Sequence, residues 1–468
     1  TSVRLRDGRV AEIGELRPAP EERVVEGREL ALAPGFVDSH SHADDGLEQE
    51  PTALALVSQG ITTAVVGLDG GSLYPLADFF DRLEASPPSV NVASYSGHNT
   101  LRARVLAPDS SRAATEREIA AMAALLRADL AAGALGLSTG LEYEPGVWST
   151  TDELVALARV AADAGGRYAS HIRSEDRELW SAIEELLEVA RRTEIPVHLS
   201  HAKLAMTSLH GEAPRLVARL ESARRQGIEV SADLYPYLYW LSSLEVFFPD
   251  REFEDLETAR FALTEVAPPE RIYLTRYRPE PDYAGRSVAG IARLRGEAPE
   301  RTLSWLAGRA QRFAVENGAA AGRVESVLAF SMSEDDVETL LRWPHTNLAT
   351  DGGLRGAHPR GFGAFPRFLG VYSRDRGVLS LTETIRRATS LAAANVGLEE
   401  RGRVRAGGPA DLVLFDPRRI GAGSTLDAPH QTAEGIERVW VNGVVVYESG
   451  EATGARPGRV LRRSPRAR

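Results

Sequence analysis

Cysteine is absent from this chain of 468 residues, and its absence excludes several classes of protein. Without a thiol there can be no disulfide framework, no cysteine-based zinc or iron–sulfur site and no thiol nucleophile. The chain also lacks any run of roughly 18 apolar residues, so we predict no transmembrane helix and no membrane partner. The opening residues, Thr1-Ser-Val-Arg-Leu-Arg6, lack the basic and then apolar layout of a signal peptide, and we expect a cytoplasmic protein.

Basic residues are also fewer than acidic residues. The chain has 55 basic and 66 acidic residues, which gives a formal charge of −11. A nucleic-acid binder usually shows a basic domain, so this balance argues against a nucleic-acid partner. Lysine is almost absent. Lys203 is the only lysine, and the other 54 basic residues are arginine. The length predicts two or three domains, or one large barrel with an accessory unit.

Short apolar runs alternate with amphipathic stretches through the middle of the chain, a pattern typical of βα units around a parallel sheet. Thr115 and Glu118 predict a capping box at the start of one helical stretch, 115–132. Eight such units predict an α/β fold, a (β/α)8 TIM-like barrel, although the count alone leaves a doubly wound sheet open. We expect the eight strands at 35–38, 62–66, 90–94, 134–137, 167–170, 196–200, 228–232 and 347–350.

The two ends of the chain have a different sequence pattern, which predicts short strands separated by turns. Two β-rich runs flank Asn442-Gly443 and predict a hairpin there. Between the seventh and eighth expected strands the chain is too long for one helix, and its two or three helical patterns indicate an insertion over the active-site face. We therefore expect a small composite β-sandwich domain at 1–33 and 400–468, a barrel at 34–399, and an inserted segment within the barrel at about 245–332.

Polar residues gather at the expected carboxyl ends of the barrel strands, where barrel enzymes keep their chemistry. In an extended segment, the His-x-His pattern at 40–42 places both imidazoles on one face, about 7 Å apart along the chain. Imidazole and carboxylate are ligands that Zn²⁺ prefers. A lone histidine is more often structural, but the joint placement of four histidines and one aspartate predicts a metal site. The candidate ligands are His40, His42, His171, His201 and Asp351.

Longer motifs around these residues carry a family resemblance over nearly the whole chain. Pro34-Gly-Phe-Val-Asp-Ser-His-Ser-His42 resembles the first-strand signature of the amidohydrolase superfamily, whose members use one or two divalent metals in a (β/α)8 barrel. Within that superfamily the chain most resembles the N-acyl-D-amino-acid deacylases, the D-aminoacylase family. The motifs that carry this resemblance are Gln59-Gly-Ile-Thr-Thr-Ala-Val-Val-Gly67, Gly136-Leu-Ser-Thr-Gly140, His171-Ile-Arg-Ser-Glu175, Ser200-His-Ala-Lys203, Ala232-Asp-Leu-Tyr-Pro-Tyr237, Asp351-Gly-Gly and His358-Pro-Arg-Gly-Phe-Gly-Ala-Phe-Pro-Arg367.

The resemblance implies an anionic ligand that bridges two metal ions. Much of the superfamily uses a carboxylated lysine after strand four, where this chain has none, and the D-aminoacylase family uses a cysteine after strand two. Here Asp69 stands at the cysteine's position and Glu142 follows strand four, and a carboxylate can also bridge. We prefer Glu142, because its strand supplies the bridge in most relatives. The resemblance places His171 and His201 with the bridge at a tighter site, and His40, His42 and Asp351 around a weaker one.

The resemblance implies metal-dependent hydrolysis of the amide bond of N-acyl-D-amino acids, with zinc as one or two ions, or manganese or cobalt instead. Asp351 would accept a proton from water and pass it to the leaving amine. The substrate's carboxylate calls for a cation, and the candidates are Lys203 and Arg360, with Arg173 and Tyr235 as neighbours. The alternatives are a dipeptidase or cyclic-amide hydrolase with the same metal centre, and a catalytically silent barrel used for binding or assembly. The expected partner is a small-molecule substrate, and the oligomeric state is left open.

Overall fold

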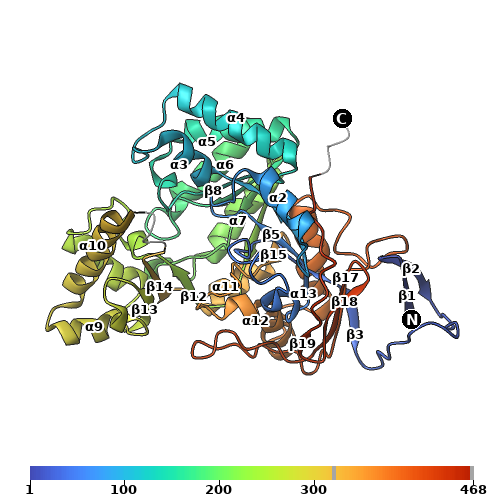
Figure 1. Cartoon of the computed structure of the whole chain (residues 1–468). Helices are drawn as coiled ribbons and strands as arrows, with labels where there is room; N and C mark the ends of the chain where they lie inside the picture. The colour runs from blue at the N-terminus through green and yellow to red at the C-terminus, as the bar shows by residue number, and fades with distance from the viewer. Residues whose placement is uncertain (319–322, 464–468) are drawn as a thin grey trace.

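Eight parallel strands form a closed barrel in the computed structural model, which describes residues 1–318 and 323–463 (Figure 1). Backbone pairing joins them into two sheets, and β7 (Ser96–Gly97) continues β6 to pair with β8. Between the sheets, Leu135 N donates to Ser94 O at 2.8 Å. This ring confirms the predicted barrel and rules out the open, doubly wound sheet. The strands are β4 (Phe36–Asp38), β5 (Ile61–Val66), β6 (Asn91–Ser94), β8 (Gly136–Gly140), β9 (Arg167–His171), β10 (Val197–Leu199), β11 (Val230–Leu234) and β15 (Thr346–Leu348).

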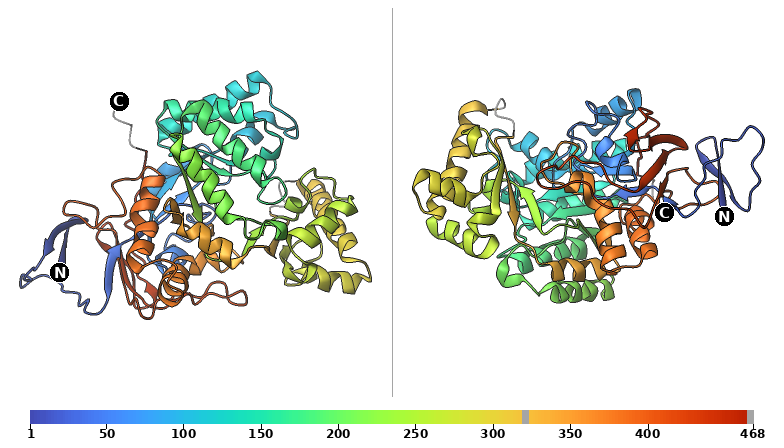
Figure 2. Two further views of the ribbon diagram at one scale, coloured as in Figure 1. Left: turned by 180° about the vertical axis from the view of Figure 1, so that it is seen from behind. Right: turned by 90° about the horizontal axis from the view of Figure 1, so that it is seen from below.

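Helices cover the outside of the barrel, as the two further views show (Figure 2). Each packs an apolar stripe inward: on α6, Ile183 and Leu187 are buried, whereas Arg191 and Arg192 are exposed. None of the helices in the described ranges is long and apolar enough to cross a membrane. The helices around the barrel are α1 (Leu54–Val57), α2 (Leu76–Ala85), α3 (His98–Leu106), α4 (Glu116–Ala132), α5 (Thr151–Asp163), α6 (Leu179–Thr193), α7 (Ala213–Arg225), α11 (Glu334–Arg342), α12 (Arg360–Arg367), α13 (Leu381–Arg386) and α14 (Ala392–Asn395).

An inserted unit lies between β11 and α11 in the chain and stands beside the barrel (Figures 1 and 2). Its centre is an antiparallel sheet ordered β12-β14-β13, in which Trp240 lies opposite Ala329 and Leu274 opposite Val327. The expected helical patterns are present, but this sheet was not predicted from the sequence. The unit contains β12 (Tyr239–Ser242), η3 (Leu244–Phe247), α8 (Leu256–Phe261), β13 (Ile272–Tyr277), α9 (Val288–Arg295), α10 (Pro299–Asn317) and β14 (Glu325–Phe330).

Strands from both ends of the chain pair in a five-stranded antiparallel sheet ordered β19-β18-β17-β16-β3. The predicted hairpin joins β17 to β18, and its turn residues Asn442 and Gly443 have φ angles of 47° and 80°, a region that these two residue types tolerate. The domain boundaries themselves stay predictions. The strands at the two ends are β1 (Ser2–Arg6), β2 (Arg9–Gly14), β3 (Ala31–Pro34), β16 (Leu412–Phe415), β17 (Ile436–Val441), β18 (Val444–Glu448) and β19 (Glu451–Ala452).

A buried carboxylate closes the seam between the first and last barrel strands. Asp38, at the end of β4, accepts hydrogen bonds from Thr350 N at 2.8 Å and from Thr350 Oγ1 at 2.6 Å. One residue further on, Asp351 N donates to His40 O at 2.8 Å. These bonds hold the loop after β15 against the loop after β4, and they therefore set where His40 and Asp351 lie.

We predict that Thr350→Val lowers the melting temperature measured by calorimetry. The substitution leaves one Asp38 oxygen buried without its hydroxyl donor, which costs about 1–3 kcal/mol. Thr63→Val is the matched control, because Thr63 lies buried in β5 and its Oγ1 has no hydrogen-bond partner in the part of the chain that the structure describes. An equal effect of the two substitutions would contradict the role given to the Asp38–Thr350 pair.

Candidate metal centre

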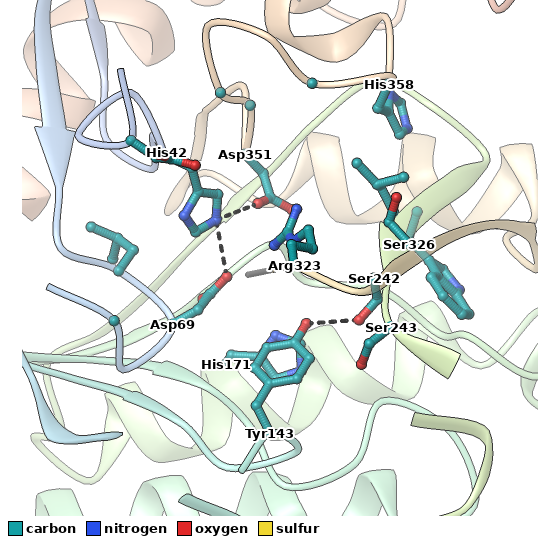
Figure 3. Close-up of a pocket in the computed structure, with 18 of the residues that line it drawn as sticks. His42, Asp69, Tyr143, His171, Ser242, Ser243, Arg323, Ser326, Asp351 and His358 are labelled. Carbon is teal, nitrogen blue, oxygen red and sulfur yellow. Dashed lines mark hydrogen bonds and ion pairs between the residues drawn. The ribbon is translucent and has the colours of Figure 1, made fainter. Parts of the chain in front are cut away.

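A cavity of about 1130 Å³ opens at the carboxyl ends of the barrel strands. Loops that follow the strands line one side, and the inserted unit lines the other, where Ser242, Ser243 and Ser326 face the histidines across the opening (Figure 3). This is the end of a barrel at which enzymes of this architecture keep their chemistry. The cavity is therefore the candidate active site.

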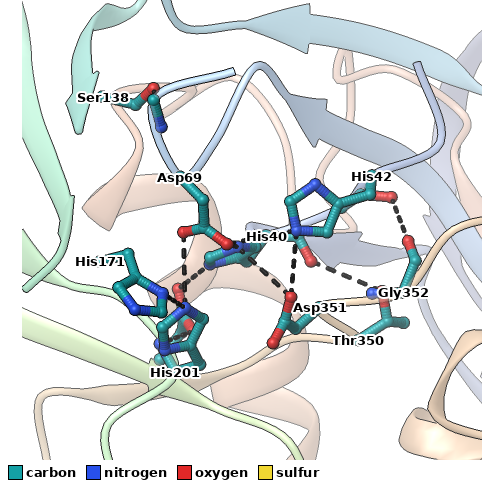
Figure 4. Close-up of polar contacts among 12 residues, drawn as sticks. His40, His42, Asp69, Ser138, His171, His201, Thr350, Asp351 and Gly352 are labelled. Atoms are coloured by element: carbon teal, nitrogen blue, oxygen red, sulfur yellow. Dashed lines mark hydrogen bonds and ion pairs between the residues drawn. The ribbon is translucent and has the colours of Figure 1, made fainter. Parts of the chain in front are cut away.

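The first group of predicted ligands surrounds Asp69, in the loop after β5 (Figure 4). Nε2 of His40 and Nε2 of His42 lie 3.2 Å and 3.3 Å from Asp69 Oδ2. Asp351 Oδ1 lies 3.1 Å from the same nitrogen of His42. The ligand atoms of these four side chains all lie within 4.8 Å of one another, a spacing that could hold one metal ion.

A second group shares the same aspartate. His201 Nε2 lies 3.4 Å from Asp69 Oδ1 and 2.9 Å from His171 Nδ1. The ligand atoms of these three residues also lie within 4.8 Å of one another. Each group thus takes a different oxygen of Asp69, which is the geometry that a bridging carboxylate needs.

Glu142, which the sequence analysis preferred as the bridge, lies at the edge of the cluster. Its Oε2 is 2.9 Å from His171 Nε2, the ring nitrogen that does not face His201. Among the residues that the structure describes, its only ligand group combines it with His171 and Glu175, without the other histidines. Asp69 thus contacts histidines of both groups and Glu142 contacts only His171, and the preference for Glu142 as the bridge stays a prediction.

Two further carboxylates lie beside the outer ring nitrogens of histidines. Glu175 Oε1 lies 2.9 Å from His201 Nδ1, whereas Asp233 Oδ2 lies 3.4 Å from His40 Nδ1 without a hydrogen bond and makes a shorter contact of 2.8 Å with His198 Nε2. Metal-binding histidines usually have such a partner, which places the proton on the outer nitrogen and leaves the inner nitrogen free to bind. Both acids lie within the family motifs, but no role was predicted for either of them. The available signal was their position, since Asp233 lies within β11 and Glu175 follows β9 closely.

The backbone is strained at three of these positions. Asp69, His201 and Asp351 have φ angles of 51°, 34° and 49°, in the left-handed region that residues other than glycine rarely adopt. Such a conformation costs about 1–3 kcal/mol per residue and collects at functional sites, where the surrounding structure holds it in place. The strain is independent support for the functional role of this cluster.

The cluster is electrostatically suited to a cation. Burial disfavours the ionised form of Asp351, but Arg360 and His201 outweigh it and hold the pKa of Asp351 below its ordinary value. Burial likewise disfavours charge on His42, yet its hydrogen bonds to Asp351 and Asp69 raise its pKa to about 9. Asp69 Oδ1 is buried and has no hydrogen-bond partner in the described ranges. These imidazole and carboxylate donors fit Zn²⁺, Mn²⁺ or Co²⁺.

Three of the four predicted substrate-binding residues lie together beside the cluster. Lys203 Nζ is buried within 2.6 Å and 2.7 Å of the two Glu175 oxygens, and Arg360 Nη1 lies 2.7 Å from Asp351 Oδ2. The Tyr235 ring lies between the two cations, with Lys203 Nζ 5.7 Å and Arg360 Cζ 4.5 Å from its centroid. Tyr235 Oη and Arg360 Nε are buried and have no hydrogen-bond partner among described residues.

Arg173, the fourth, does not line the cavity. It pairs with Glu185 through Nε at 2.9 Å and Nη2 at 3.0 Å, and it donates to Val147 O at 2.8 Å and Ser149 O at 3.1 Å. These bonds tie the loop after β8 to helix α6. Its donors are used in these structural contacts, and its role in substrate binding stays a prediction.

Comparison with known proteins identifies relatives over nearly the whole chain. The model of the amidohydrolase family matches residues 283–447. The D-aminoacylase of Alcaligenes xylosoxydans xylosoxydans is 35% identical over 485 residues, which cover 98% of this chain and 93% of that protein. The N-acyl-D-aspartate deacylase of the same organism is 37% identical over 487 residues, 98% of this chain and 90% of that protein.

A solved structure extends the likeness to three dimensions. The N-acyl-D-glutamate deacylase of Bordetella bronchiseptica, in complex with zinc and a phosphonate inhibitor that mimics the tetrahedral intermediate, matches with a TM-score of 0.86. It is 34% identical, and the match covers 98% of this chain and 95% of that one. Identity at this level over the whole length, on the same barrel, establishes common ancestry. The chain is a member of the D-aminoacylase family of amidohydrolases.

Proposed function

We propose that this protein is a metal-dependent deacylase that hydrolyses N-acyl-D-amino acids to a carboxylate and a free D-amino acid. The observation that carries this proposal is the Asp69 carboxylate, which lies 3.2 Å from His40 and 3.4 Å from His201 beside the buried cations Lys203 and Arg360. The names of the relatives, D-aminoacylase and N-acyl-D-aspartate deacylase, agree with it. The proposed partner is a small molecule, and the proposed location is the cytoplasm.

The metal would be zinc, as one or two ions, with manganese or cobalt as alternatives. When bound, it polarises the scissile carbonyl and lowers the pKa of a water ligand. Asp69 would bridge the two positions, and Glu142, Glu175 and Asp233 would hold the imidazole rings. The proposed ligands are His40, His42, Asp69, His171, His201 and Asp351.

Asp351 is the proposed proton carrier. Its Oδ1 faces His42 at 3.1 Å and its Oδ2 faces Arg360 at 2.7 Å, so the carboxylate is both oriented and ionised. An ionised carboxylate beside the scissile bond can take a proton from the attacking water and return it to the amine nitrogen. The return step matters because an amide anion is a poor leaving group.

The cations beside Asp351 would hold the substrate's α-carboxylate. Arg360 Nε and Tyr235 Oη, both buried and without a protein partner in the described ranges, can donate hydrogen bonds to it. Lys203 would contribute charge from a position held by Glu175. An α-carboxylate fixed here orients the amide toward Asp351, which would make the site selective for amino-acid amides.

We predict that the zinc-loaded protein releases free amino acid from N-acetyl-D-amino acids faster than from the L enantiomers, dipeptides or hydantoins. A coupled assay with D-amino acid oxidase for the D products, and chromatography for the others, measures the rates. Preferred hydrolysis of dipeptides or hydantoins would favour the alternative with the same metal centre. No hydrolysis of any compound, together with no stoichiometric metal, would favour the catalytically silent barrel.

We predict that Asp69→Asn and Glu142→Gln separate the two candidate bridges by metal binding. Asp69→Asn removes a charge shared by both ligand groups, so the zinc content after dialysis should fall. Glu142→Gln leaves both groups intact and should keep the zinc content, with an affinity weakened by about 10–100-fold in a chelator competition. Full zinc content in Asp69→Asn with loss in Glu142→Gln would restore Glu142 as the bridge.

We predict that Lys203→Arg lowers kcat/KM by about tenfold or more, because the wider guanidinium must fit a buried space built for one ammonium. Lys203 Nζ already lies 2.7 Å from His201 Nδ1 as well as against Glu175. Circular dichroism and zinc content confirm that the variant is folded and loaded. Wild-type activity would show that any cation serves at this position.

A further inference from the structure

A second cavity, of about 310 Å³, lies at the amino ends of the barrel strands, away from the candidate metal centre. Its lining includes Arg167 at the start of β9 and Pro196 just before β10. His198 of β10 and Ser231 of β11 also line it, and both are buried. The proposed mechanism uses neither of them, so the role of this buried histidine in the barrel interior is open.

Strand pairing places His198 between a hydroxyl group and a carboxylate. His198 lies directly opposite Ser231 in the β10–β11 register, and Asp233 follows Ser231 by two residues on the same face of β11. His198 Nδ1 lies 2.7 Å from Ser231 Oγ, and His198 Nε2 lies 2.8 Å from Asp233 Oδ2. Because a carboxylate has no donor, the neutral ring donates from Nε2 to Asp233 and accepts the Ser231 hydroxyl at Nδ1. His198 is therefore held at both ring nitrogens.

The Asp233 carboxylate leads from this histidine to both groups of proposed metal ligands. Its Oδ1 accepts a hydrogen bond from His201 N at 2.7 Å, and its Oδ2 lies 3.4 Å from His40 Nδ1. His201 has a φ angle of 34°, so the bond to its backbone supports a strained residue that carries a ligand. One carboxylate thus contacts His40 of the first ligand group and His201 of the second.

The distances show which contacts fix Asp233. Its contacts with His198 Nε2 and His201 N, at 2.8 Å and 2.7 Å, are hydrogen bonds, whereas His40 Nδ1 at 3.4 Å forms none. Of the side chains that the structure describes, only His198 is hydrogen-bonded to Asp233. Without His198, Oδ2 would lose its donor and the carboxylate could turn relative to His40.

We propose that His198 is a positioning residue of the metal centre, acting through Asp233 on His40 and His201. This inference rests on the proposed metal-dependent function, because it treats His40 and His201 as metal ligands. The groups that orient metal ligands are themselves held by hydrogen bonds, and their loss weakens metal binding. His198 provides this support from the barrel interior, on the side of the amino-terminal cavity.

Zinc affinity, measured by competition with a chelator, tests the proposal without an activity assay. We expect His198→Leu, which removes both ring nitrogens, to weaken zinc binding by about tenfold or more. His198→Gln should recover most of the affinity, because its amide N–H can reach the place of Nε2, whereas the shorter His198→Asn should not. The Gln and Asn variants also test the proposal if His198→Leu does not fold, and equal affinities in these two would overturn it.

His98→Leu is the matched control for the loss of a buried histidine. His98 Nε2 lies 2.8 Å from Glu153 Oε1, the same distance as in the His198–Asp233 pair, and neither His98 nor Glu153 belongs to a ligand group in the described ranges. Its zinc affinity should match that of the wild-type protein.

Cobalt absorption spectra distinguish positioning from a general loss of stability. With Co²⁺ in place of zinc and equal metal content, we expect the visible bands to shift in His198→Leu and to stay unchanged in His98→Leu. Wild-type affinity and spectrum in folded His198→Leu, or equal losses in the two leucine variants, would overturn the proposal. If the wild-type protein binds no stoichiometric zinc, the proposed metal-dependent function fails as well, which separates the two failures.

Discussion

The contact between the Asp69 carboxylate and three imidazoles is the interaction on which the proposed chemistry depends. Its oxygens lie 3.2, 3.3 and 3.4 Å from nitrogens of His40, His42 and His201, which come from opposite sides of the barrel. A buried charge costs several kcal/mol unless it is compensated, so the carboxylate needs these partners or a metal ion. In the proposed site it would also keep an anion at the bridging position of a chain without cysteine. A carboxylate is a harder ligand than a thiolate, which widens the choice of metals toward Mn²⁺ and Co²⁺.

This convergence exists only because the barrel closes. Asp38 binds Thr350 across the seam, and the next bond, from Asp351 N to His40 O, brings ligands more than 300 residues apart in sequence into one cluster. Asp69, His201 and Asp351 adopt left-handed conformations in the loops that follow strands of this closed ring. A large rigid core can hold backbone strain of about 1–3 kcal/mol per residue, whereas an open loop would relax it. The site and the stability of the fold are therefore coupled through the same bonds.

Much of this architecture was predictable from the sequence, because strands and helix caps are local features. All eight barrel strands overlap their expected ranges, and the Thr115–Glu118 capping box is present, with both reciprocal bonds. The properties that the sequence leaves open depend on packing. Glu142 and Asp69 both follow barrel strands, and only their distances to the histidines distinguish an orienting partner from a shared ligand. Arg173 sits in a family motif, but its contacts with Glu185 could not be read from the motif.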